Sequence, residues 1–150
     1  MRMFIAFIAS TVLITSPGNA LAELITVPTS LNPGDQYRVV FVTSGTRDAT
    51  STNIVNYNNF VSNAANAVPP LANLGTTWTA MASTSAVDAR DNTNTVPSIV
   101  AGGSIGVPIF LLNDTKLVDN YDDLWDGDID VPFNRTELDT ETSCTAPLGV

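Results

Sequence analysis

The amino-acid sequence predicts a small α+β domain, on three observations. Residues 37–43 are rich in β-branched residues, and two sets of side chains alternate along them. This pattern is typical of a strand. Residues 52–66 carry apolar side chains at helical spacing, and residues 106–114 form a short apolar strand. A helix between two strands favours one main helix packed on a small mixed sheet.

The chain opens with the features of a secretory signal peptide. Arg2 precedes an apolar run over residues 4–14, which is followed by Pro17-Gly18 and by Ala20-Leu21-Ala22. A charged start, an apolar core, a helix breaker and a small-x-small site are typical of a cleaved export signal. The apolar run is shorter than the ~20 residues of a membrane-spanning helix, so a membrane anchor is the weaker alternative. We expect residues 1–22 to be removed and residues 23–150 to form a single α+β domain without a transmembrane segment, secreted or at the cell surface.

The composition excludes several classes of site. The chain has 6 basic and 15 acidic residues, and removal of Arg2 leaves 5 against 15, a net charge of −10. Nucleic-acid binding depends on cationic side chains that displace counterions, so the acidic balance excludes it and favours cations or neutral ligands such as sugars. The chain has no histidine, and Cys144 is the only cysteine, which removes most zinc and copper sites.

Each element has a local signal. The segment before the first strand contains the turn Asn32-Pro33-Gly34-Asp35, and residues 37–43 are expected to be buried on both faces. Thr50, Ser51 or Thr52 is the expected N-cap of the helix over 52–66, and Pro69-Pro70 ends that element.

The second half of the chain shows weaker signals. Residues 76–83 read as a strand or an extended segment with Trp78 and Ala80 on one face, and Trp78 is expected in the core. Asp88, Arg90 and Asp91 read as a charged turn, in which Arg90 forms a half-buried ion pair. After residue 114 we expect short turns, with one helical turn from Asp122 to Trp125.

The sequence gives no support for an enzyme. Gly102-Gly103-Ser104-Ile105-Gly106 matches a nucleophile elbow, but such a serine needs a histidine base and the chain has none. A glycosidase needs a pair of carboxylates, and nothing in the sequence singles out one pair. We therefore expect a protein without catalytic activity.

The stretch "VDNYDDLWDGDIDVPFN", residues 118–134, gathers six aspartates around Trp125. Carboxylates this close can supply several oxygens to calcium, and the candidate ligands are Asp122, Asp126, Asp128 and Asp130. The alternative is a solvated acidic turn, because Gly127 is misplaced for an EF-hand loop and no glutamate closes it. Trp125 either covers the core or offers a flat face to a sugar ring.

Several of these segments resemble a known group of proteins. "YRVVFVTSGTRDATS", "TWTAMAS" and "DLWDG" are similar to exported bacterial proteins of unassigned function, several of which carry a C-terminal Pro-Glu-Pro sorting tag (the PEP-CTERM type). The pieces Val107-Pro108-Ile109 and Leu124-Trp125-Asp126-Gly127 more distantly resemble the endostatin-like region of collagen. Both resemblances imply a C-type-lectin-like α+β fold. They also imply that relatives continue past Val150 with further cysteines, so this domain is expected to be incomplete on its C-terminal side and Cys144 to lack a mate.

The resemblance implies no catalytic residue, and it sets the functional expectation. The leading interpretation is a secreted or cell-surface binding domain without catalysis, with a glycan or an extracellular-matrix polymer as its ligand. The alternatives are a structural protein of the envelope or matrix and a calcium-dependent polysaccharide hydrolase.

Overall fold

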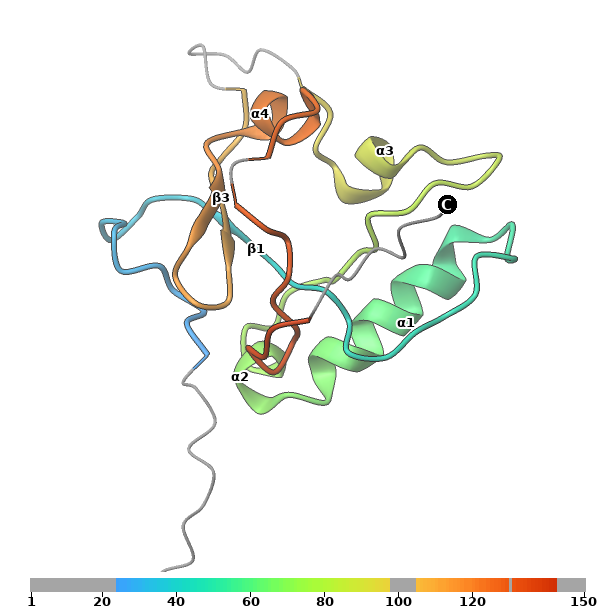
Figure 1. Cartoon of the computed structure of the whole chain (residues 1–150), viewed down its shortest axis with the longest axis horizontal. Helices are drawn as coiled ribbons and strands as arrows, with labels where there is room; N and C mark the ends of the chain where they lie inside the picture. The colour runs from blue at the N-terminus through green and yellow to red at the C-terminus, as the bar shows by residue number, and fades with distance from the viewer. Residues whose placement is uncertain (1–23, 98–104, 130, 143–150) are drawn as a thin grey trace, which may run out of the picture.

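The computed structural model describes residues 24–97, 105–129 and 131–142 of the chain (Figure 1). A three-stranded sheet has the order β1-β2-β3, in which β1 and β2 are parallel and β2 and β3 are antiparallel. The strands and helices are β1 (Arg38–Val40), α1 (Ile54–Asn66), α2 (Pro69–Ala72), α3 (Ala89–Thr93), β2 (Ile109–Leu111), β3 (Lys116–Val118) and α4 (Tyr121–Trp125). The predicted mixed α+β class is confirmed. The expectations for residues 1–22, Asp130 and Cys144 lie outside the described residues.

Strand β1 is shorter and more exposed than the sequence predicts. Its three residues are half-buried, so the prediction of burial on both faces is wrong. The reason is its place at an edge of the sheet, where only β2 lies beside it. Past the strand, Val42 forms an isolated parallel bridge with Thr136, and its N–H donates to the Arg135 carbonyl over 2.7 Å. The segment around residue 136 therefore continues the sheet where β2 ends.

Strand β3 corrects the expectation of short turns after residue 114. The Leu111 N–H donates to the Thr115 carbonyl over 2.9 Å and closes a tight hairpin between β2 and β3. Asp114 takes the left-handed backbone conformation, with φ of 70°, which short polar residues tolerate best. Asn113-Asp114 between two apolar runs is a hairpin signal that the sequence carried.

Helix α1 forms where its spacing predicts, and its cap lies one residue beyond the expected positions. The Asn53 side chain accepts a hydrogen bond from the Val55 N–H over 3.0 Å, in place of Thr50, Ser51 or Thr52. Helix α2 follows directly, with Pro69 in its first turn. Proline has no backbone N–H, and an N–H at this position would have no hydrogen-bond partner within the helix, so nothing is lost.

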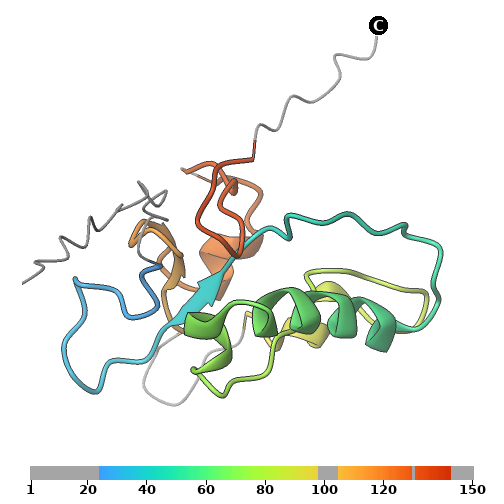
Figure 2. The same cartoon turned by 90° about the horizontal axis from the view of Figure 1, so that it is seen from below.

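The sheet separates two apolar clusters. The first joins α1 and α2 to one face and contains Phe41, Ala65, Val68, Leu71, Trp78 and Leu112. The second joins α4 to the other face and contains Ile109, Leu111, Leu117, Val118 and Leu124. Leu111 and Leu112 enter different clusters because successive residues of a strand point to opposite faces. Figures 1 and 2 show β1 passing between these two parts of the molecule.

Two further expectations concern the segment between α2 and α3. Residues 76–79 form neither helix nor strand, and Trp78 and Ala80 are buried as predicted, at 8% and 7% exposure. The charged turn expected around Arg90 is instead the helix α3. Asp88 caps it by accepting a hydrogen bond from the Arg90 N–H over 2.8 Å, so the aspartate serves the helix end.

A candidate binding cleft beside strand β1

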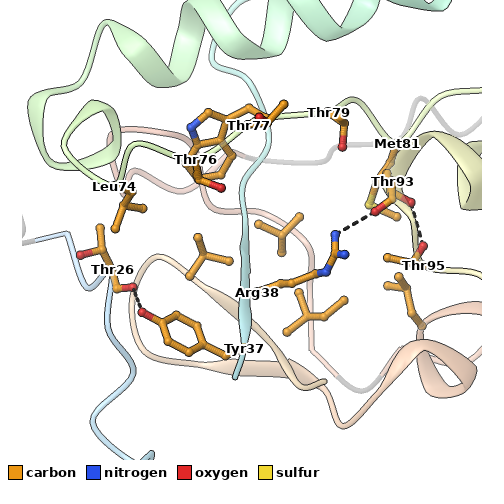
Figure 3. Close-up of a pocket in the computed structure, with 15 residues that line it drawn as sticks. Thr26, Tyr37, Arg38, Leu74, Thr76, Thr77, Thr79, Met81, Thr93 and Thr95 are labelled. Carbon is orange, nitrogen blue, oxygen red and sulfur yellow. Dashed lines mark hydrogen bonds between the residues drawn. The ribbon is translucent and has the colours of Figure 1, made fainter. Parts of the chain in front are cut away.

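A cavity of about 530 Å³ runs along β1 on the side away from β2 (Figure 3). One wall is β1 itself, with Tyr37 before it, and the facing wall is the segment 76–79 with Met81. The lining takes Val39 from one face of the sheet and Val40 from the other. Because both faces contribute, the cavity follows the edge of the sheet and reaches both apolar clusters.

The lining is rich in hydroxyl groups. Six threonines line the cavity: Thr26, Thr76, Thr77, Thr79, Thr93 and Thr95. Thr93 and Thr95 are buried and share a hydrogen bond of 2.7 Å between their hydroxyls. The hydroxyls can donate and accept, so the cleft offers polar contacts above an apolar floor.

Arg38 is the charged side chain of this lining. Its guanidinium donates to the Thr93 carbonyl over 2.8 Å, to the Asn94 carbonyl over 3.2 Å and to the Tyr121 hydroxyl over 2.8 Å. Its carbon Cζ also lies 5.3 Å from the centre of the Tyr121 ring. Within the described part of the chain no carboxylate lies within ion-pair distance of Arg38.

The facing wall is anchored from behind by amide and hydroxyl side chains. The Ser62 hydroxyl donates to the Trp78 carbonyl over 2.9 Å. The Ala80 N–H donates to the Asn58 side chain over 2.9 Å, and the Ala80 carbonyl accepts from the Asn92 side chain over 2.7 Å. These contacts turn the backbone groups of Trp78 and Ala80 toward α1 and α3. The indole N–H of Trp78 is buried and has no acceptor among the described residues.

The predicted calcium ligands are spread along α4 and the turn after it. Asp122 lies in the first turn of α4, and Asp126 accepts a hydrogen bond from the Asp128 N–H over 2.8 Å; all three are exposed. Asp130 lies outside the described residues. In the ranges 24–97, 105–129 and 131–142, no three acidic, cysteine or histidine side chains gather as metal ligands do. The calcium site and its alternative, a solvated acidic turn, both stay open.

Trp125 lies against the core beneath this acidic turn. Its indole N–H donates to the Thr95 hydroxyl over 3.0 Å, and the ring packs against the second apolar cluster. The guanidinium of Arg90 lies 5.2 Å from the centre of the ring. The expected ion pair of Arg90 is therefore wrong for the described residues, because the aromatic ring takes the place of a carboxylate.

Sequence reasoning missed the cleft. Its walls come from segments about 40 residues apart, near residues 38 and 78, and no local pattern shows that they face each other. The signal that could have marked the wall is "TTWTA", in which threonines alternate with apolar residues.

Comparisons with known proteins find no match for this chain among protein-family models, curated proteins or solved structures. No helix in the described ranges has the length and apolar character that crossing a membrane requires.

Proposed function

We propose that this protein is an exported binding domain without catalytic activity, and that an extracellular polymer occupies the cleft beside β1. The observation that carries the proposal is a cavity of about 530 Å³ that combines hydroxyl groups, an apolar floor and one cation. This volume lies within the range of about 300–1,000 Å³ that is usual for ligand sites. A half-open cleft along a sheet edge suits a chain-like ligand, which can extend beyond both ends.

Export and the finer fold are parts of the same proposal. Export is supported by the order of charged, apolar and small residues over positions 1–22. A C-type-lectin-like or endostatin-like fold is supported by the resemblance of "TWTAMAS" and "DLWDG" and by a helix packed on a mixed sheet. Glycans and matrix polypeptides are the two ligand classes that such a domain would meet outside the cell.

The proposal is tested with immobilised polymers and a variant that fills the cleft. Thr77 is exposed and lines the cavity, so Thr77→Trp places a large ring in the cleft at little cost to folding. Ser85 is exposed and lies outside the lining, so Ser85→Trp is the matched control. The probes are alginate, a neutral β-1,4-glucan and gelatin on sensor surfaces.

We expect the unmodified chain and Ser85→Trp to bind at least one polymer, and Thr77→Trp to bind it at least tenfold more weakly. Equal binding by the two variants would place the ligand elsewhere, and binding to none of the polymers would contradict the proposal. Release of soluble fragments from a polymer would make the protein a hydrolase. Concentration-dependent self-association without polymer binding would favour the structural role.

A further inference from the structure

We infer that the ligand of the cleft is an extended polypeptide segment of another protein, which joins the sheet as an added strand beside β1 and carries an acidic side chain opposite Arg38. The inference rests on the proposed function and deepens it, because it chooses polypeptide over glycan as the polymer. Three features of the cleft support it: the free edge of β1, the size of the cavity and its charge.

The outer edge of β1 offers unpaired backbone groups. The Arg38 N–H donates to the Pro108 carbonyl over 3.0 Å, and Arg38 and Val40 are the residues whose backbone groups face β2. Residues alternate in a parallel ladder, so the N–H and carbonyl of Val39 point away from β2, toward the cleft. Neither group has a hydrogen-bond partner among the described residues. Unpaired groups of this kind at a sheet edge can pair with another strand.

The facing wall closes one end of the cleft. Its backbone is held from behind, because the Trp78 carbonyl and both backbone groups of Ala80 are bonded on the side of α1 and α3. Thr77 and Thr79 line the cleft, and Figure 3 shows their segment crossing β1 instead of running beside it. An added strand would therefore pair along β1 alone and meet the facing wall at one end.

The size of the cavity matches a short strand. Strand spacing, rise per residue and layer spacing give roughly 160 Å³ for one residue in a sheet. A cavity of about 530 Å³ thus holds about three strand residues, the length of β1. A strand there would place alternate side chains on the two apolar clusters, beside Trp78 on one face and beside Ile109 and Leu124 on the other.

Charge selects among possible strands. Arg38 has no carboxylate partner in the described ranges, and none of the lining residues is acidic. Its side chain lies on the same face of β1 as Val40. An aspartate or glutamate on that face of the added strand would meet the guanidinium and form a charge-assisted hydrogen bond. A neutral glycan would leave this charge and the free backbone groups of Val39 without their best partners.

Strand addition is tested with a synthetic peptide, acetyl-TVEVTV-amide, added to the isotope-labelled full chain and followed by NMR. We expect the amides of Val39, Thr77 and Thr79 to shift, and hydrogen exchange at Val39 to slow at least tenfold at saturation. Two control peptides carry N-methyl groups on alternate amides, one set for each edge of the strand. The set on the edge beside β1 should lose binding at least tenfold, and the other set should bind like the unmodified peptide, because only β1 lies beside the added strand.

A second pair of probes tests the charge. The peptide TVQVTV should bind the unmodified chain about tenfold more weakly than TVEVTV, as expected for loss of a hydrogen bond between charged groups. In Arg38→Gln the two peptides should bind alike. A preference for glutamate that survives this substitution would overturn the role of Arg38.

A neutral hexasaccharide of β-1,4-linked glucose separates this inference from the proposed function. Binding of the sugar in the cleft without binding of the peptides would overturn strand addition and leave the proposed binding function standing. Equal binding of the two N-methylated peptides would also overturn strand addition. If neither peptide nor sugar binds and Thr77→Trp changes no polymer binding, both proposals are wrong.

Discussion

The carboxylate of Glu137 accepts hydrogen bonds from the backbone N–H and the hydroxyl of Ser44, 93 residues earlier in the chain. The N–H contact is 2.8 Å long, and Glu137 is only 6% exposed. This pair lies beside the bridge between Val42 and Thr136. It fixes the chain just after β1 to the segment over residues 134–142, and so it helps to set the position of the cleft wall.

The first prediction follows from this pair. Glu137→Ala should lower the free energy of unfolding by about 1.5–3 kcal/mol, because a charged hydrogen-bonding group is removed from a buried place. Glu141 is the control: it is exposed and pairs with Arg135 over 2.8 Å, so Glu141→Gln should cost less than about 1 kcal/mol. Urea denaturation measures both. Equal losses for the two variants would show that the contact with Ser44 does not stabilise the fold.

The second prediction concerns the approach of Gly106 to Tyr121. A methyl group at Gly106 would overlap the Tyr121 ring, and φ of Gly106 is +106°. Gly106→Ala should therefore cost about 1–3 kcal/mol for the overlap, in addition to backbone strain. The Tyr121 hydroxyl accepts from Arg38, so the variant should also displace that guanidinium.

Gly34 provides the matched control. Its φ is +102° and a methyl group there would meet no atom within 4 Å, so Gly34→Ala carries strain alone. Thermal denaturation of the two variants separates overlap from strain. If Gly34→Ala destabilises the protein as much as Gly106→Ala, the ring contact is not the cause.

The parts of the fold that the sequence predicts well are those decided by local chemistry. The helix over 52–66, the burial of Trp78 and Ala80 and the turn from Asp122 to Trp125 each depend on spacing within one short segment, and the structure contains all three. The spacing of apolar and polar residues predicts such elements well, because burying one face is enough to decide whether the segment is a helix or a strand.

The parts that the sequence does not predict depend on distant segments. The exposure of β1 follows from its place at the sheet edge, and its pairing with β2 joins residues about 70 positions apart. Arg90 illustrates the same limit: its nearby aspartates suggested an ion pair, and tertiary packing instead places it over Trp125. The cleft could not be predicted because its two walls come from segments about 40 residues apart, and no local pattern shows that they meet.

The third prediction tests the contact between Arg90 and Trp125. A double-mutant cycle with Arg90→Gln and Trp125→Leu should give a coupling of about 0.5–1 kcal/mol, as expected for a guanidinium over an aromatic ring. Arg47→Gln serves as the control, since Arg47 lies over Tyr57 and should show no coupling to Trp125→Leu. A coupling free energy of zero between Arg90 and Trp125 would mean that their contact does not stabilise the fold.

The fourth prediction concerns the loop before α1. The Thr50 hydroxyl, 2.8 Å from Asp48, and the Thr50 N–H, 3.4 Å away, hold the pKa of Asp48 below its usual 3.8, and the Arg47 charge acts in the same direction. Because the pKa is lower in the folded state, this carboxylate stabilises the loop above its usual pKa. That stabilisation is lost as the pH falls through the folded-state pKa.

Thr50→Val removes the hydroxyl donor and should raise the pKa of Asp48 toward 3.8, which an NMR titration of the carboxyl carbon measures. Thr52 is exposed nearby without such a contact, so Thr52→Val should leave the titration of Asp48 unchanged. A pKa that stays low in Thr50→Val would assign the shift to a cause other than the hydroxyl.

The fifth prediction separates calcium from solvation in the acidic segment. The exposed Asp122, Asp126 and Asp128 are spread over α4 and the following turn, and Asp126 is engaged with the Asp128 N–H. We therefore expect the midpoint of thermal unfolding to be the same, within about 1 °C, in millimolar calcium and in EDTA. An ion bound at a hundred times its dissociation constant would add about 2.7 kcal/mol, which raises the midpoint by several degrees. A rise of that size in the unmodified chain, absent when Asp122, Asp126, Asp128 and Asp130 are all changed to asparagine, would establish the calcium site and replace the solvated-turn interpretation.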